Sequence, residues 1–258
     1  MARRLIKGKM HAHALMQSHP GLAKRLPTLR WMNRSTLVSM LNQYGMVYIK
    51  PNLGSQGNGV IRVEKHPQHY KFHAGTAVSE FRSYDAMYAA LAPHTRRKPY
   101  VVQKGIHVLR HKGRPFDFRV MIQRNPKRDW ECTGIFGRLA HPGKAVTNGS
   151  QGGTIYEPSA LLAPRAGTSR TPYLLRIMNR LAYKTAATLS SKYPQLNELG
   201  LDICLDRKLN PWILEVNTIP DPKPFTLLPN PRMLSRIIAY GRAYGRRYNL
   251  KVTKARKA

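Results

Sequence analysis

Acidic residues are scarce in this chain, and they are concentrated in one short segment. The sequence has 12 Asp and Glu residues against 44 Lys and Arg, a formal net charge of +32. Five of the 12 lie between residues 198 and 221: Glu198, Asp202, Asp206, Glu215 and Asp221. In so basic a protein, a group of carboxylates must either pair with cations or hold a metal ion. This segment is where we first expect chemistry.

The acidic segment predicts two antiparallel strands joined by a tight turn. If residues 207–210 form a four-residue loop, Asp206 lies opposite Pro211. The same register places Asp202 directly opposite Glu215. Two carboxylates in that position repel each other unless a cation lies between them. The hairpin therefore predicts a cation-binding site.

Two kinds of cation could satisfy this pair. Strand alternation puts Asn217 on the same face as Glu215, with Asp202 beside them. Carboxylate and amide oxygens are ligands that Mg²⁺ takes, with phosphate and water completing its octahedron. The alternative is a local ion pair, but the nearby Arg207 and Lys208 lie in the turn, at a different level. We therefore favour Mg²⁺ over a local ion pair.

The overall charge and the hydropathy limit the classes of function. A charge of +32 attracts polyanions, although a solvated basic surface explains much of it equally well. No run of 18 apolar residues occurs, which argues against a membrane span. No helix-turn-helix or RNA-binding signature is present, so specific nucleic-acid binding is not expected. Cys132 and Cys204 form no zinc or redox motif, which favours a reducing, cytoplasmic compartment.

The remaining patterns predict helices and short strands in alternation. Ser35 is the expected N-cap of the first helix, and Ser83 caps a second helix that ends before Pro93. The expected helices are 35–44, 83–92, 172–194 and 231–245, and the expected strands 46–50, 60–65, 99–105, 116–124 and 130–140, followed by the acidic hairpin. This order predicts an α+β fold with two lobes that meet near residue 98.

A glycine-rich loop follows the predicted strand 46–50. It begins after Lys50 and contains Gly54, Ser55, Gly57 and Gly59. Such a loop can bring backbone N–H groups onto phosphate oxygens while the lysine adds a positive charge. It matches neither the Walker A nor the dinucleotide-binding pattern. The alternative is a glycine hairpin beside an exposed lysine.

Two further groups could contact phosphate. Asp117 and Arg119 share one face of the strand 116–124, where a cross-strand structural ion pair is an equally good interpretation. Arg138 precedes a polar loop, residues 147–153, that contains Asn148. Glycines and amides in that loop suit phosphate contacts, although solvent-exposed loops have the same composition.

Taken in order, these motifs resemble a known superfamily. They are K-P-x-x-G-S-x-G-x-G-V, then V-Q-K-G, D-F-R-V, T-N-x-x-x-G-G and, after the acidic strand, L-E-V-N. The series resembles the ATP-grasp superfamily, and within it the YheC/YheD branch associated with bacterial spore coats. The resemblance extends from about Lys9 to Tyr244 and implies an ATP-grasp fold with ATP held between two α+β lobes.

The resemblance also implies roles for individual residues. ATP would be bound by Lys9, Lys50, Gly54, Ser55, Gly57 and Gly59, and by the hinge residues Gln103, Lys104 and Ile106. Mg²⁺ would be held by Asp202, Glu215 and Asn217. The catalytic group would comprise Asp117, Arg119, Arg138 and Asn148, with the arginines stabilising the transferred phosphoryl group. Many relatives carry an acidic residue where this chain has Lys104, so the contacts with ribose are expected to differ.

The resemblance also implies how the chain divides into segments and which reaction it catalyses. We expect a basic segment (1–20), an N-terminal lobe with the phosphate loop (21–97), a C-terminal lobe with the metal site (98–245) and a basic tail (246–258). The superfamily typically ligates a carboxylate, activated by ATP as an acyl-phosphate, to an amine or similar nucleophile. An ATP-grasp kinase, a nucleotide-binding coat protein without catalysis and a polyanion-binding protein remain as alternatives.

The substrates are not identified by the sequence. The basic surface suggests an acidic peptide or polymer as co-substrate or partner. The chain begins close to the ATP-binding module, so the acceptor pocket is expected to be open or completed by another chain. A cytoplasmic, spore-associated location is the expectation that the resemblance adds.

Overall fold

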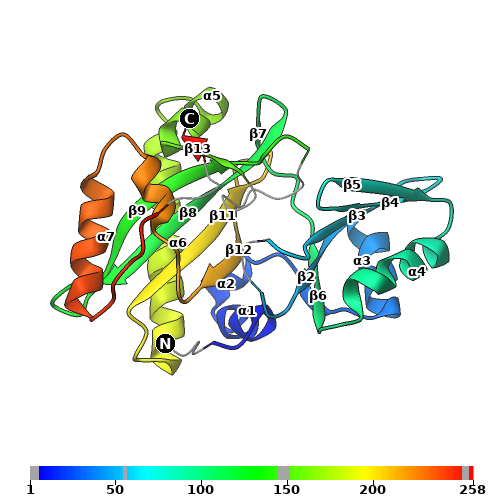
Figure 1. The fold of residues 1–258 in the computed structure, drawn as a ribbon, viewed down its shortest axis with the longest axis horizontal. Helices are drawn as coiled ribbons and strands as arrows, with labels where there is room; N and C mark the ends of the chain where they lie inside the picture. Colours follow the sequence, from blue (N-terminus) through cyan, green and yellow to red (C-terminus); the bar gives the residue numbers. More distant parts are fainter. Residues whose placement is uncertain (1–5, 55–56, 144–151, 252–255, 258) are drawn as a thin grey trace.

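The structure is a computed structural model that describes residues 6–54, 57–143, 152–251 and 256–257. Two β-sheets, each carrying its own helices, lie next to each other (Figure 1). Among the described residues, no helix combines the length and apolar character needed to cross a bilayer. The arrangement is the α+β architecture that the order of elements predicts.

The first sheet has six antiparallel strands in the order β1-β6-β2-β3-β4-β5. The helices α3 and α4 cover it, with Leu37 and Met40 of α3 packing with Met87 of α4 in one buried cluster. The elements are β1 (Leu29–Trp31), α3 (Arg34–Tyr44), β2 (Met46–Pro51), β3 (Ile61–Lys65), β4 (Tyr70–Ala74), β5 (Ala77–Phe81), α4 (Tyr84–Thr95) and β6 (Tyr100–Lys104).

Two predicted helix ends differ from the structure. The N-cap of α3 is Asn33, whose side chain accepts a hydrogen bond from the Thr36 backbone N–H at 2.7 Å, so the assignment to Ser35 is wrong. Ser83 caps α4 as predicted, but the helix continues through Pro93 to Thr95. The proline removes one backbone hydrogen bond, and the helix ends two residues after it.

The second sheet is built on the long strands β8 and β9. Its order is β12-β11-β8-β9-β10-β13, and β7 pairs with β8 at the edge of the interlobe region. The elements are β7 (Arg110–His111), β8 (Arg114–Arg124), β9 (Trp130–Leu139), β10 (Thr154–Tyr156), α5 (Pro158–Ala166), α6 (Thr171–Lys192), β11 (Glu198–Leu205), β12 (Pro211–Asn217), the 3₁₀ helix η2 (Lys223–Leu227), α7 (Arg232–Ala243) and β13 (Arg256–Lys257).

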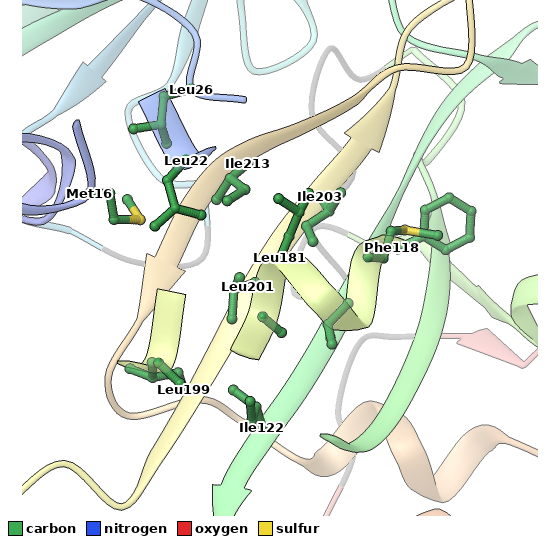
Figure 2. Packing of buried hydrophobic residues seen from close by; sticks show 14 of the residues in the cluster. Met16, Leu22, Leu26, Phe118, Ile122, Leu181, Leu199, Leu201, Ile203 and Ile213 are labelled. Carbon is green, nitrogen blue, oxygen red and sulfur yellow. The ribbon is translucent and has the colours of Figure 1, made fainter. Parts of the chain in front are cut away.

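Two apolar clusters stabilise this lobe. One of them joins Leu181 of α6 to Phe118, Leu201 and Ile203 of the sheet (Figure 2). The other joins residues of α7 and η2 to β8 and β9, where the Phe136 and Phe225 rings meet edge to face, 4.8 Å apart. The sheet therefore lies between two layers of helices, and its polar end faces the first lobe.

The N-terminal helices belong to the core of the second lobe. Met16 of α1 (Lys9–Gln17), Leu22 of α2 (Pro20–Ala23) and Leu26 are buried in the same cluster as Leu181 (Figure 2). At the other predicted boundary, β6 is hydrogen-bonded to β1 and β2, so the chain leaves the first sheet only after Lys104. By sheet membership the chain passes to the second sheet after residue 104, and the expected domain limits at residues 20/21 and 97/98 stay predictions.

The acidic hairpin has the predicted register on one side of a bulge. Asp202 lies opposite Glu215 as expected. The register then shifts after Asp202, and Leu205, rather than Asp206, lies opposite Pro211. The predicted pairing at the loop end is wrong because one additional residue of β12 is accommodated in this bulge.

Candidate nucleotide site

A cleft between the two lobes gathers most of the residues that the sequence singles out. The lining residues from the first lobe include Tyr48, Lys50, Gly54, Gly57, Gln103 and Lys104, and the others include Lys9, Ile106, Asp117, Arg138, Asp202, Cys204, Leu214 and Glu215. Among the predicted site residues that the structure describes, three do not line this cleft: Gly59, Arg119 and Asn217. Ser55 and Asn148 lie outside the described residues.

Lys50 is the buried cation of the first lobe. Its Nζ donates a hydrogen bond to Gln103 Oε1 at 2.5 Å, and Gln103 Nε2 in turn donates to the Leu214 carbonyl oxygen at 3.1 Å. Gln103 therefore links β6 to β12 across the cleft and holds Lys50 at the same time. Burial lowers the pKa of Lys50, and the negative charge of Glu215 partly counteracts this effect.

Lys9 provides a second cation from the start of α1. Its Nζ lies 3.4 Å from Glu215 Oε1 and 3.4 Å from the Gly54 carbonyl oxygen. The lysine thereby connects the glycine-rich loop to β12. Glu215 keeps 24% of its side chain exposed, so this carboxylate is accessible from the cleft.

Four charged side chains form a buried network in the floor of the cleft. Asp117 lies directly opposite Arg138 in the β8–β9 pair, and Arg119 lies opposite Asp202 in the β8–β11 pair. Arg138 binds Asp117 through two hydrogen bonds of 2.8 and 2.7 Å. Arg119 Nε contacts Asp202 Oδ1 at 2.5 Å, and Arg138 Nη2 contacts Asp202 Oδ2 at 3.1 Å.

This network determines the charge state of Asp202. Burial by itself would raise the pKa of the carboxyl group, but Arg119 and Arg138 hold the pKa of Asp202 at about 2. The cross-strand structural ion pair considered for this strand therefore exists, since Asp117 pairs with Arg138 on the next strand. Arg119 lies behind Asp202 and fixes its position.

The three residues that would hold Mg²⁺ are not equally suited to bind a metal ion. No group of three His, Cys, Asp or Glu side chains arranged for a metal occurs in the described part of the chain. Asp202 already has an arginine on each oxygen, so its charge is balanced by cations of the protein. Glu215 is partly exposed and faces one lysine at 3.4 Å. Asn217 lines an adjoining cavity together with Glu215, and these two oxygen donors suit Mg²⁺.

Apolar residues also contribute to the lining of this cleft, next to the hinge. Tyr48, Val60, Ile106, Val108 and Leu214 line it, and an apolar surface with a few polar groups suits a flat heterocycle. The Lys104 Nζ lies 5.1 Å from the centroid of the Tyr44 ring and 5.3 Å from that of Trp212. These cation–π contacts hold Lys104 at the junction of the lobes.

Comparison with known proteins agrees with this geometry. The family described as YheC/D like ATP-grasp matches residues 1–244. The chain belongs to this ATP-grasp family. Its relatives include the endospore coat-associated proteins YheD and YheC of Bacillus subtilis strain 168. YheD is 24% identical over 82% of this chain and 48% of its own length, and YheC is 22% identical over 81% and 58%. The chain thus spans about half the length of these relatives.

Solved structures show the same fold. The carboxyaminoimidazole ribonucleotide synthase of Aspergillus clavatus, complexed with ATP, is 12% identical with a TM-score of 0.54, over 83% of this chain and 44% of that one. A second structure of the enzyme, with ADP and its aminoimidazole ribonucleotide, has a TM-score of 0.51 with the same identity and the same shares. The predicted ATP-grasp fold and the predicted family are confirmed.

The sequence motifs do not predict every residue that lines the cleft. Tyr48, Val108 and Cys204 line the cleft but belong to none of the quoted motifs, and Leu214 belongs to L-E-V-N without being singled out for a role. Leu214 and Glu215 are consecutive and yet both line the cleft, which a regular strand would not permit. The register shift in the β11–β12 pair accounts for this, since a bulge changes the alternation of side chains.

Proposed function

We propose that this ATP-grasp protein binds Mg²⁺-ATP in the interlobe cleft and ligates a carboxylate to an amine or a similar nucleophile. The observation that carries the proposal is the convergence of Lys9, Lys50 and Arg138 on a cleft that also holds the partly exposed Glu215. Three cations around one accessible carboxylate suit a triphosphate and a divalent ion. The ATP and ADP complexes of the structural relatives support the choice of nucleotide.

The proposed reaction has two steps. A substrate carboxylate oxygen attacks the γ-phosphorus, the bond between this phosphorus and the bridging oxygen breaks, and ADP leaves. The nucleophile then attacks the carbonyl carbon of the acyl-phosphate, inorganic phosphate leaves, and the attacking amine releases its proton to solvent. Neither step requires a covalent bond to the protein, so its side chains act by positioning and by electrostatic stabilisation.

The residues of the cleft take distinct parts in this proposal. Lys50 and Lys9 offset the negative charge of the phosphates, and Gln103 keeps Lys50 in place. Arg138, held by Asp117, faces the charge that develops on the transferred phosphoryl group. Arg119 acts through Asp202 and is a positioning residue.

Glu215 and Asn217 would hold Mg²⁺, with Asp202 nearby. When bound there, Mg²⁺ would supply positive charge that offsets the negative charge of the phosphates. The coat association of the two relatives supports a place for this chain at the spore surface as part of the same proposal.

Trapping of the acyl-phosphate tests the proposal. We would incubate the protein with Mg²⁺-ATP, a pool of carboxylic acids and hydroxylamine, which converts an acyl-phosphate into a stable hydroxamate. The expected result is hydroxamate in equal amount to the ADP released, and loss of both products in Lys50→Met. The matched variant Lys50→Arg keeps the charge and is expected to retain part of the activity.

The other outcomes are equally informative. ADP release that accompanies a phosphorylated acceptor, without hydroxamate, would show a kinase. Nucleotide binding without any release of ADP would show a non-catalytic nucleotide-binding protein. Either result would overturn the ligase proposal.

A further inference from the structure

A second cleft adjoins the nucleotide cleft and is strongly basic. It shares Tyr48, Ile106, Val108 and Pro115 with the nucleotide cleft, so the two are continuous. We call it the basic cleft and define it by five lining residues: Arg62, His73, Arg110, Arg114 and Arg207. Its volume of about 440 Å³ is large enough for several residues of an extended ligand to contact it.

The basic cleft is formed by both lobes. Arg62 on β3 and His73 on β4 come from the first sheet. Arg110 on β7 and Arg114 on β8 come from the second lobe, and Arg207 lies in the loop between β11 and β12. Arg62 is paired with Glu64, and burial lowers the pKa of His73, so the uncompensated cations are the three arginines of the second lobe. A ligand that neutralises all three must carry more than one negative group.

The positive charge of the basic cleft is largely uncompensated. No Asp or Glu occurs among its described lining residues. Arg62 pairs with Glu64 at 2.5 Å, but Arg110, Arg114 and Arg207 form no ion pair with any carboxylate that the structure describes. Arg110 and Arg114 each donate one hydrogen bond to a backbone carbonyl oxygen. A guanidinium has five N–H donors, so most of their donors are left for a ligand.

Two nitrogen atoms of the first-lobe wall are not available to a ligand. Arg62 Nε and His73 Nε2 are buried and have no hydrogen-bond partner among the described residues. Because solvent does not reach either atom, a ligand bound in the cleft does not reach them either. The donors available to a ligand are those of Arg110, Arg114 and Arg207.

We propose that the basic cleft binds a peptide segment rich in Asp and Glu. Guanidinium groups match carboxylates in a planar, two-pronged geometry, and a series of carboxylates along a peptide can reach several of the three arginines. The second part of this inference rests on the proposed function: the acidic segment belongs to the substrate whose carboxylate is activated in the adjoining nucleotide cleft. Binding itself requires neither nucleotide nor catalysis.

Binding of a fluorescent oligoglutamate peptide to the full chain, without nucleotide, tests the proposal. The double variant Arg110→Gln/Arg114→Gln is expected to bind the peptide at least about 10-fold more weakly, and the exposed loop variant Arg207→Gln about 3-fold more weakly. The control Arg232→Gln/Arg242→Gln removes the same charge from exposed positions of α7 and is expected to change the affinity less than about 2-fold. Unchanged melting temperatures would show that the variants fold.

Each alternative result would overturn the proposal. Equal losses in the two double variants would mean that the net charge, and not the cleft, attracts the peptide. Equal binding of an oligoglutamine peptide would exclude recognition of carboxylates. Stronger competition by a single-stranded oligonucleotide or by inorganic phosphate, at matched charge, would point to a phosphate ligand.

The same assay separates this inference from the proposed function. If the chain binds oligoglutamate through Arg110 and Arg114 but yields no hydroxamate, the ligase proposal fails and the basic cleft stands. If hydroxamate forms from simple acids while oligoglutamate does not bind, the ligase proposal stands and the basic cleft proposal fails.

Discussion

Asp202 and Glu215 lie directly opposite each other in the β11–β12 pair, but their charges are balanced by cations from different parts of the chain. Asp202 is bound by Arg119 from the neighbouring strand β8 and by Arg138 from β9, the next strand of the sheet. Glu215 faces Lys9, which comes from the N-terminal helix. The first carboxylate is therefore fixed in the core, whereas the second can exchange its partner for a ligand.

We first predict that the buried network contributes strongly to stability. Asp117→Asn removes the bidentate partner of Arg138, whose side chain is only 5% exposed. Breaking a buried ion pair by removing one partner typically costs about 3–5 kcal/mol, and the remaining contact with Asp202 should keep the loss near the lower value. The free energy of unfolding, measured with urea, would show this loss.

The control for this prediction is an exposed pair. Asp85 contacts Arg34 at 2.5 Å, with side chains that are 72% and 59% exposed. Asp85→Asn is expected to cost less than about 1 kcal/mol because solvent screens such pairs. Equal losses in the two variants would contradict the structural role that we assign to Asp117.

A second prediction concerns the pH dependence of nucleotide binding. Burial lowers the pKa of Lys50, so this lysine loses its proton at a lower pH than an ordinary lysine. Its attraction for phosphate is present below that pKa and is lost as the pH rises through it. We expect the affinity for ATP, measured by fluorescence titration from pH ~7 to ~10, to fall before the usual lysine range is reached.

Lys50→Arg is the matched variant for the titration. A guanidinium stays protonated throughout this range, so the alkaline decrease should disappear even if the affinity at neutral pH is lower. The same decrease in wild type and variant would assign the titration to another group.

A third prediction concerns the loop of the acidic hairpin. Asp206 accepts hydrogen bonds from the backbone N–H groups of Lys208 and Asn210, at 2.9 Å each, and from Trp212 Nε1 at 3.0 Å. Burial opposes ionisation, but these hydrogen bonds outweigh it and lower the pKa of Asp206 below its usual value. The stability that this shift provides is present above the unfolded-state pKa of about 3.9 and is lost as the pH falls through the folded-state pKa.

Asp206→Asn should therefore be less stable than wild type at neutral pH, with a difference that shrinks in acid. Urea unfolding at a series of pH values between ~6 and ~3 would measure this. A difference that stays constant over the series would contradict the assignment, because it would not depend on the protonation of Asp206.

Local patterns predicted much of the site. Asp202 lies opposite Glu215 as predicted, although the loop register is wrong by one residue and the bulge in β12 compensates for that error. Lys50 and Gln103, which the motif order singles out, line the cleft. The partners of Asp202 were not predictable in this way. Arg119 reaches it because β8 lies next to β11, and these strands are separated by more than 70 residues in the sequence. The cations that pair with Asp202 are therefore distant in the sequence, and Arg207 and Lys208 near the turn are not among them.

Other errors have similarly local causes. Ser35 and Asn33 are both good capping residues, and only the structure shows which one accepts the hydrogen bond from Thr36. The hairpin of β4 and β5 was not predicted, although Gly75, at φ 66°, supplies its turn. The bulge that exposes Leu214 to the cleft has no clear signal in the sequence.

The central claim is that Glu215 holds the metal of a bound Mg²⁺-ATP, and a thermal unfolding experiment tests it most directly. A ligand present at about 100 times its Kd stabilises the folded state by about 2.7 kcal/mol. We predict a clear rise in melting temperature with Mg²⁺-ATP, a smaller rise when EDTA removes the metal, and loss of the Mg²⁺-dependent part in Glu215→Ala with its own fold intact. No rise at millimolar Mg²⁺-ATP, or the same rise in Glu215→Ala, would contradict the account.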